Sequence, residues 1–89
     1  MDYQSLGRLD IKLLLALQVL IEERSVTKAA TRLHVSQPAM SKTLLKLKQV
    51  FDDPLFTRSA HGLVATPKTK QLAATLPPLL KQLQQLVNQ

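Results

Sequence analysis

The chain contains no cysteine and only two glycines among its 89 residues. Without cysteine it has no disulfide framework, no thiolate zinc site and no cysteine nucleophile, which suits a reducing cytoplasm. Two glycines are too few for a glycine-rich phosphate-binding loop, and the histidines, His34 and His61, stand alone in the sequence. Each histidine therefore fits a turn or surface position better than a metal site. Neither an enzyme nor a bound metal or cofactor is expected.

Long apolar runs are also missing. The longest one covers residues 13–21 and is interrupted by Gln18, whereas a membrane helix needs about 20 apolar residues. Asp2 comes early in the chain, and no apolar core with a small-residue cleavage site follows it. The sequence thus predicts no membrane segment, no export signal and a cytoplasmic location.

Acidic residues are also few. Six of them stand against twelve lysines and arginines, which gives a formal net charge of +6 and a pI near 10.1. All the acids lie at or before Glu23 except Asp52 and Asp53. The cations between these two groups are Arg24, Lys28, Arg32, Lys42, Lys46 and Lys48. Positive charge concentrated in this way favours a polyanionic partner.

Two helical patterns with a very short turn between them occupy residues 25–47, SVTKAATRLHVSQPAMSKTLLKL. The first begins at Ser25, a helix-capping residue, and the second at Ser36, with Pro38 in its first turn. Only His34 and Val35 separate the patterns. This is too short for antiparallel packing, so the helices must cross steeply, as in a helix-turn-helix. The second helix, residues 36–51, is then the one that reads DNA.

This second helix divides into an apolar stripe and a polar face. At about 100° per residue, one side gathers Met40, Leu44, Leu47 and Phe51. The opposite side and its flank carry Gln37, Pro38, Ser41, Lys42, Leu45, Lys46 and Gln49. Gln37 can form two hydrogen bonds with adenine, and Lys42 can reach guanine or phosphate. Taken alone, this face also fits the solvent side of any amphipathic helix, so the DNA interpretation depends on its neighbours.

Two short extended runs, residues 56–58 and 63–65, flank a turn that contains Gly62. A hairpin beside a helix-turn-helix is a wing, which rests on phosphates or enters the minor groove. Arg58 is the cation placed for either contact. The alternative is a surface ion pair between Arg58 and Asp52 or Asp53.

The order and spacing of these segments resemble the amino-terminal winged helix-turn-helix of LysR-type transcriptional regulators, over residues 9–66. Besides residues 25–47, the segments DDPLFTR and GLVATP carry the resemblance. The base contacts it implies are Gln37, Pro38, Ser41 and Lys42. The contacts it implies with the DNA backbone or minor groove are Thr27, Ser36 and Arg58, to which we add Ser25 and Lys46.

Two residues depart from the common pattern of this family. Lys48 stands where many members carry glutamate, and Thr69 stands where many carry glycine. Neither lies on the predicted reading face, although Lys48 removes any ion pair that the family makes there. Together with the segment DDPLF, these two residues are similar to the branch of the family that contains the nodulation regulators and LeuO-type proteins.

The segment before the helix-turn-helix predicts a scaffold helix. Asp10 is a suitable cap, and the apolar residues that follow at helical spacing are Leu13, Leu14, Leu17, Leu20 and Ile21. We expect this face to complete a three-helix core with Ala29, Ala30, Leu33 and the apolar stripe of residues 36–51.

Residues 67–89 predict a linker helix, with Thr66 as its cap and Pro67 at its first position. Alternating steps of four and three, the spacing of a coiled-coil seam, join Leu72, Leu76, Leu79, Leu83 and Leu86. Pro77 and Pro78 should kink or restart the helix, since an interior proline costs roughly 3 kcal/mol. The alternative for the leucine stripe is packing against the chain's own core.

The predicted fold is mainly α: a three-helix core with a two-stranded wing in residues 1–66, then the linker helix of residues 67–89. The resemblance implies that this helix pairs two subunits and leads to an effector-binding domain that the chain does not include. We expect sequence-specific binding of double-stranded DNA and regulation of transcription by a homodimer, or by a tetramer of the whole regulator. A small-molecule effector would bind only the absent domain. The rival is a winged helix that binds protein through apolar anchors, and only Leu45 fits that role.

Overall fold

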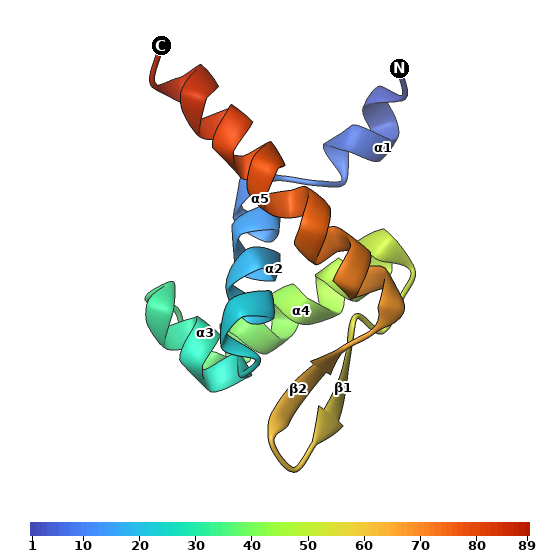
Figure 1. The fold of residues 1–89 in the computed structure, drawn as a ribbon, viewed down its shortest axis with the longest axis vertical. Coiled ribbons are helices and arrows are strands. Elements are labelled where there is room, and N and C mark those ends of the chain that lie inside the picture. The colour runs from blue at the N-terminus through green and yellow to red at the C-terminus, as the bar shows by residue number, and fades with distance from the viewer.

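A computed structural model describes all 89 residues, as five helices and one two-stranded sheet. The elements in chain order are α1 (Tyr3–Gly7), α2 (Ile11–Glu23), α3 (Val26–Arg32), α4 (Gln37–Phe51), β1 (Phe56–Ser59), β2 (Gly62–Ala65) and α5 (Pro67–Val87). The molecule measures 42 × 26 × 23 Å, and the hairpin and the two chain ends lie at opposite ends of it (Figure 1). No helix combines the length and the apolar character needed to span a bilayer. This is the predicted winged helix-turn-helix followed by a long helix.

The four helices predicted from the sequence each begin at a capping side chain. In each case a side-chain oxygen accepts a hydrogen bond from the backbone N–H three residues further on. The distances are 2.8 Å for Asp10, 3.1 Å for Ser25, 3.2 Å for Ser36 and 3.3 Å for Thr66. Such caps satisfy amides that the first helical turn leaves free. The predicted starts of α2, α3, α4 and α5 are therefore confirmed.

The predicted three-helix core is also confirmed, with small residues where α3 meets its neighbours. Ala29 and Ala30 are 0% and 3% exposed, which lets α3 pack closely against α2 and α4. The buried members of the other two helices include Leu13, Leu17, Leu20, Met40, Leu44 and Leu47. The remaining predicted residues pack only at the edge of the core, partly buried: Leu14, Ile21, Leu33 and Phe51.

The wing forms where the sequence places it. Strands β1 and β2 pair antiparallel, with Arg58 opposite Leu63 and Ser59 opposite Gly62. Each strand is one residue longer than predicted, because the hydrogen-bonded ladder extends to that last pair. Phe56 and Leu63 point into the core while Arg58 is exposed, so the hairpin is both anchored and solvent-facing.

A polar junction holds the wing to α5. Leu55 has a left-handed backbone (φ 65°) and is fully buried. Its N–H donates to Asp53 Oδ1 at 2.7 Å, and the hydroxyl of Thr66 donates to the same oxygen at 2.8 Å. The buried hydroxyl of Thr69 donates to the carbonyl oxygen of Leu55 at 2.8 Å. The end of α4, the wing and the start of α5 thus share one network.

The leucine stripe on α5 divides between two environments. Leu76 is only 4% exposed, and Leu72 is partly buried against the same core. The packing of Leu76 inside its own chain does not support its assignment to a seam between subunits, whereas the assignment of the partly buried Leu72 stays a prediction. Further along, Leu79 and Leu86 are 40% and 64% exposed, and Leu83 is partly buried.

The prolines of α5 do not divide it into two helices. A single helix runs from Pro67 to Val87 with Pro77 and Pro78 inside it. A restart at this point, one of the two predicted outcomes, does not occur. Leu76 and Leu80 flank the prolines and pack against the core, so tertiary contacts hold the helix together where two backbone donors are missing.

Short helix α1 was not predicted from the sequence. It buries none of its residues, so it lacks the apolar periodicity on which helix prediction depends. The side chain of Asp2 caps it by accepting from the N–H groups of Gln4 and Ser5. The hydrogen bond from the Ser5 hydroxyl is the main reason why the pKa of Asp2 is lowered.

Candidate nucleic-acid interface

The outward face of α4 presents polar side chains on a buried base. Gln37, Pro38, Ser41 and Lys42, the predicted base-contacting residues, are all exposed. Met40, Leu44 and Leu47 on the other side of the same helix are 2%, 8% and 0% exposed. Since the buried side fixes the helix against α2 and α3, the exposed side is held in one direction. It offers an amide, a hydroxyl and an ammonium group within the first two turns of the helix.

A shallow groove runs along one flank of this face. It lies between α2, the turn after α3, and α4, encloses about 660 Å³, and includes Lys42 and Lys46 in its lining. Leu45 is 56% exposed and is the large apolar residue on the face. The lysines of this mostly apolar lining suit phosphate, while Leu45 can contact a thymine methyl group.

The predicted backbone-contacting hydroxyls lie at the start of α3 and α4. Ser25 and Ser36 are N-caps, so each oxygen accepts a hydrogen bond from a backbone N–H. A hydroxyl that accepts still has its own proton to donate. Thr27, in the first turn of α3, is exposed. These three side chains can therefore act as donors to an anionic oxygen while the caps stay intact.

Arg58 occupies the predicted place on the wing without an acidic partner. Both ion pairs in the molecule involve Arg32. Asp53, one of the partners considered for Arg58, instead accepts hydrogen bonds from Leu55 and Thr66. The alternative of an ion pair with Asp52 or Asp53 is therefore not observed, and the guanidinium of Arg58 is available to a ligand.

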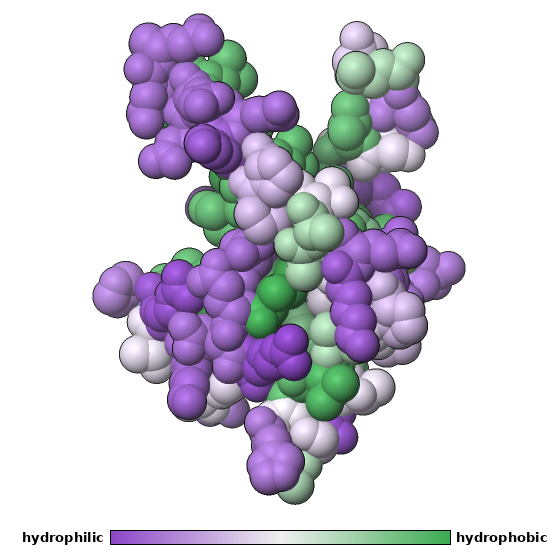
Figure 2. All heavy atoms as spheres, in the orientation of Figure 1, coloured by the Kyte–Doolittle hydropathy of each residue, from purple (hydrophilic) through white to green (hydrophobic).

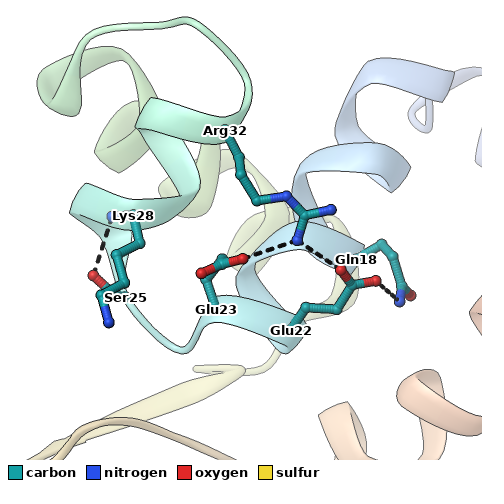
Figure 3. Close-up of polar contacts among 6 residues, drawn as sticks. All are labelled: Gln18, Glu22, Glu23, Ser25, Lys28 and Arg32. Carbon is teal, nitrogen blue, oxygen red and sulfur yellow. Dashed lines mark hydrogen bonds and ion pairs between the residues drawn. The ribbon is translucent and has the colours of Figure 1, made fainter.

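An ion-pair network at the end of α2 accounts for two of the six acids (Figure 3). Arg32 reaches from α3 to Glu22 at 2.7 Å and to Glu23 at 2.9 Å. The amide nitrogen of Gln18 donates to Glu22 at 2.7 Å. Glu22 has a lowered pKa, chiefly from the Gln18 hydrogen bond and then from Arg32, while the two carboxylates raise the pKa of Arg32. Both carboxylates at the end of α2 are thus paired with a single cation from α3.

The acidic and histidine side chains do not form clusters. Nowhere do three or more acidic or histidine side chains gather as a metal site would require. His34 lies in the turn between α3 and α4 with a positive φ of 57°, and His61 is exposed in the turn of the wing. Both occupy the turn and surface positions expected from the sequence.

A second groove lies between α2 and the outer half of α5 and shares Leu15 with the first. It encloses about 680 Å³, and its apolar lining includes Ile11, Leu15, Leu80, Leu83 and Val87. Ile11 and Leu15 are 52% and 43% exposed. Figure 2 shows hydrophobic residues around the base of the notch between the two chain ends, with hydrophilic residues covering the outer face of α5. This surface is unlike the polar face of α4.

Two residues near these surfaces were not singled out from the sequence. Gln18 lines the second groove, and its carbonyl oxygen is buried without a hydrogen-bond donor. Arg24 ends α2 in a left-handed conformation and is exposed. The only available signal was indirect: Arg24 stands immediately before the capping Ser25, where a helix end commonly carries glycine.

Comparisons with known proteins agree with this geometry. Residues 11–70 match the family model described as "Bacterial regulatory helix-turn-helix protein, lysR family". The chain is 44% identical over 85 residues to the HTH-type transcriptional regulator SyrM 1 of Sinorhizobium fredii, a match that covers 96% of this chain and 25% of that protein. The name of this relative denotes a regulator and not an enzyme.

Solved structures give the same result. The crystal structure of "probable transcriptional regulator PA0477" from Pseudomonas aeruginosa superposes with a TM-score of 0.85 at 36% identity, over 92% of this chain and 28% of that one. A complex of the BenM DNA-binding domain with catB site 1 DNA superposes with a TM-score of 0.83 at 26% identity, over 90% of each chain. The present chain spans about a quarter of the length of the curated relatives it matches.

Proposed function

Because the chain belongs to the LysR family of bacterial regulatory helix-turn-helix proteins, we propose that it reads double-stranded DNA as half of a symmetric pair and regulates transcription. The observation that carries this proposal is the polar outward face of α4, fixed by the buried residues beneath it. The similarity to a DNA-bound BenM domain supports the use of this face of α4 for binding DNA. The site of action would be the cytoplasm, where bacterial DNA lies.

In this proposal α4 enters the major groove. Gln37 and Lys42 provide the hydrogen-bonding groups suited to adenine and guanine, and Pro38 and Ser41 contact base edges beside them. Lys46 and the hydroxyls of Ser25, Thr27 and Ser36 bind phosphates and fix the register. The exposure of Gln37 and Lys42 within the first two turns of the helix supports this division.

The wing would hold the flanking minor groove or its phosphates through Arg58. Its guanidinium is exposed and unpaired, and the strand that carries it is hydrogen-bonded to a partly buried partner strand. A cation in a narrow minor groove gains from the concentrated negative potential there. Sequence preference in the flanks would then follow groove width instead of base identity.

The outer half of α5 would pair two copies of the chain. Leu79, Leu83 and Leu86 remain available for this seam, and the second groove adds the exposed Ile11 and Leu15. A whole regulator could assemble further into a tetramer, and its effector would bind a domain outside this chain.

Selection from a random duplex pool tests the proposal as a whole. We expect the chain to enrich an interrupted palindrome, because two reading helices related by a two-fold axis read two half-sites. Binding should also weaken steeply with salt, since much of the affinity comes from phosphate contacts. Binding without an enriched sequence would contradict base reading, and failure to bind any duplex would favour the protein-binding alternative.

Replacement of Gln37 by alanine tests base reading directly. Loss of its paired hydrogen bonds should remove ~1–3 kcal/mol of discrimination between the selected duplex and a scrambled one. Affinity for the scrambled duplex should change little. Gln82→Ala, which removes an exposed amide from α5, is the matched control. Equal losses on both duplexes for Gln37→Ala would contradict the assigned role.

A further inference from the structure

Arg24 places a long cation at a backbone position that favours glycine. It ends α2 with φ 54° and ψ 33°, the left-handed conformation. A side chain other than glycine is strained there, and helices that end in this way usually carry glycine at this point. The capping geometry requires the conformation but does not require an arginine. The presence of an arginine side chain at this position therefore calls for a separate explanation.

The position of Arg24 adjoins the wing. Its carbonyl oxygen accepts a hydrogen bond from the N–H of Leu63 at 2.9 Å. Leu63 pairs with Arg58 across the hairpin, so Arg58, Leu63 and Arg24 follow one another across three adjacent backbone segments. Figure 1 places the corner between α2 and α3 in the same half of the molecule as the wing. The backbone of Arg24 thus lies beside the strand that pairs with the one carrying Arg58.

The acids nearest to Arg24 in the sequence are occupied by another cation. Arg32 holds both Glu22 and Glu23, and Gln18 donates to Glu22 as well (Figure 3). Arg24 forms no ion pair and is exposed, as is Lys28 in the following helix. Both carboxylates are thus engaged by Arg32 and neither is paired with Arg24, whose charge remains available to an external anion.

We propose that Arg24 binds a DNA phosphate beside the wing, so that the interface continues from Arg58 across the corner between α2 and α3. This inference rests on the proposed DNA-binding function, in which the wing lies on the duplex. The contact carries no sequence information, because a phosphate is the same at every step of the backbone. It strengthens binding to any duplex and fixes the angle at which the wing meets it.

Two substitutions separate this role from a structural one. Arg24→Ala and Arg24→Gly should each weaken binding about tenfold, on the selected duplex and on a scrambled one alike. Each should also reduce the slope of log affinity against log salt by about 0.9, the value for one lost phosphate contact. Arg24→Gly should at the same time raise the melting temperature, because glycine adopts the left-handed conformation without strain. Arg24→Lys should retain the salt slope.

Arg8→Ala is the matched control. Arg8 lies before the opposite end of α2, is exposed, and makes one hydrogen bond to the carbonyl oxygen of Gln49. Its replacement should leave affinity and salt slope as in the original chain. The proposal for Arg24 is overturned when Arg24→Gly binds with unchanged affinity or unchanged salt slope while Arg58→Ala still weakens binding. Failure of the unaltered chain to bind any duplex would instead overturn the proposed DNA-binding function, and this inference with it.

Discussion

At the scale of single residues, Ala30 shows that the helix-turn-helix depends on small side chains where its helices meet. It is 3% exposed and adjoins Ala29, which is 0% exposed. Both lie where α3 contacts α2 and α4. Protein interiors are packed as densely as organic crystals, so there is no spare volume at such a contact. The orientation of α4, and with it the reading face, depends on this close approach.

Replacement of Ala30 by leucine should therefore destabilise the chain by ~1–3 kcal/mol or more through overpacking. Denaturant unfolding measures the loss, and DNA binding should fall with it because α4 is displaced. Ala74→Leu, at an exposed position of α5, should leave stability nearly unchanged. A stable Ala30→Leu variant that binds DNA normally would refute the packing described here.

The residue scale also sets a limit on sequence interpretation. The exposure of Lys42 could be predicted, because the helical period places it opposite Met40 and Leu44, while Gln37 lies on the flank of that face in the first turn. Arg24 could not be identified in the same way, because its interest arises from a backbone angle and from the engagement of Glu22 and Glu23 elsewhere. Neither property can be inferred from the residues adjacent to Arg24 in the sequence.

At the scale of elements, the wing is held to the helices through Gly62. This glycine has φ +112°, and a Cβ atom built on it would lie 2.7 Å from the carbonyl oxygen of Arg24. That oxygen accepts the hydrogen bond from Leu63. A side chain at position 62 would therefore force the hairpin away from the end of α2 while its own strand pairing could persist.

Gly62→Ala should weaken DNA binding without unfolding the three-helix core. The strained backbone and the clash together should cost about 1–3 kcal/mol of stability. Thermal unfolding and duplex titration measure the two effects. If the lost affinity comes from a displaced wing, adding Arg58→Ala should cause little further loss. Gly7→Ala, where nothing lies within 4 Å of the new Cβ, is the control. Full affinity in Gly62→Ala would separate the wing from DNA binding.

Among the elements, those with local signals could be predicted and those with ambiguous partners could not. Ser36 and Thr66 mark helix starts because a capping side chain acts within three residues. The stripe on α5 carries a seven-residue repeat, which describes a buried face but not its partner. Leu76 faces the chain's own core whereas Leu86 is exposed, and only the path of α5 across α2 separates the two.

At the scale of the whole molecule, the two candidate interfaces use different elements. The wing and the polar face of α4 form one, and the apolar groove between α2 and the outer half of α5, which meets the groove beside α4 at Leu15, forms the other. A pair joined at the groove would therefore leave both reading faces uncovered. Association and DNA binding should be separable by substitution.

Leu86→Glu tests this separation. Leu86 is 64% exposed, so the fold of one chain should not change. A charge in an apolar seam should weaken association roughly tenfold or more, since a buried leucine contributes about 1.5–3 kcal/mol. Sedimentation equilibrium measures the self-association, and titration with a single half-site measures the intact reading face. Ala74→Glu, on α5 but outside the leucine stripe, is the control. An original chain that remains monomeric at all concentrations would contradict the seam.

The junction at Leu55 has a consequence for how a pair would choose its DNA. The carbonyl oxygen of Leu55 accepts from the N–H of Thr66 at 3.0 Å and from the hydroxyl of Thr69 at 2.8 Å, so the base of the wing and the start of α5 move as one piece. In a pair joined through α5, the distance between the two α4 helices would therefore be coupled to the contact that each wing makes with DNA. Half-sites at the wrong separation could be reached only by rotating α5, and that rotation would lift a wing from its groove. Operators with the wrong half-site spacing would thus lose affinity for two reasons, because the reading helices would miss their half-sites and the wings would lose their DNA contacts.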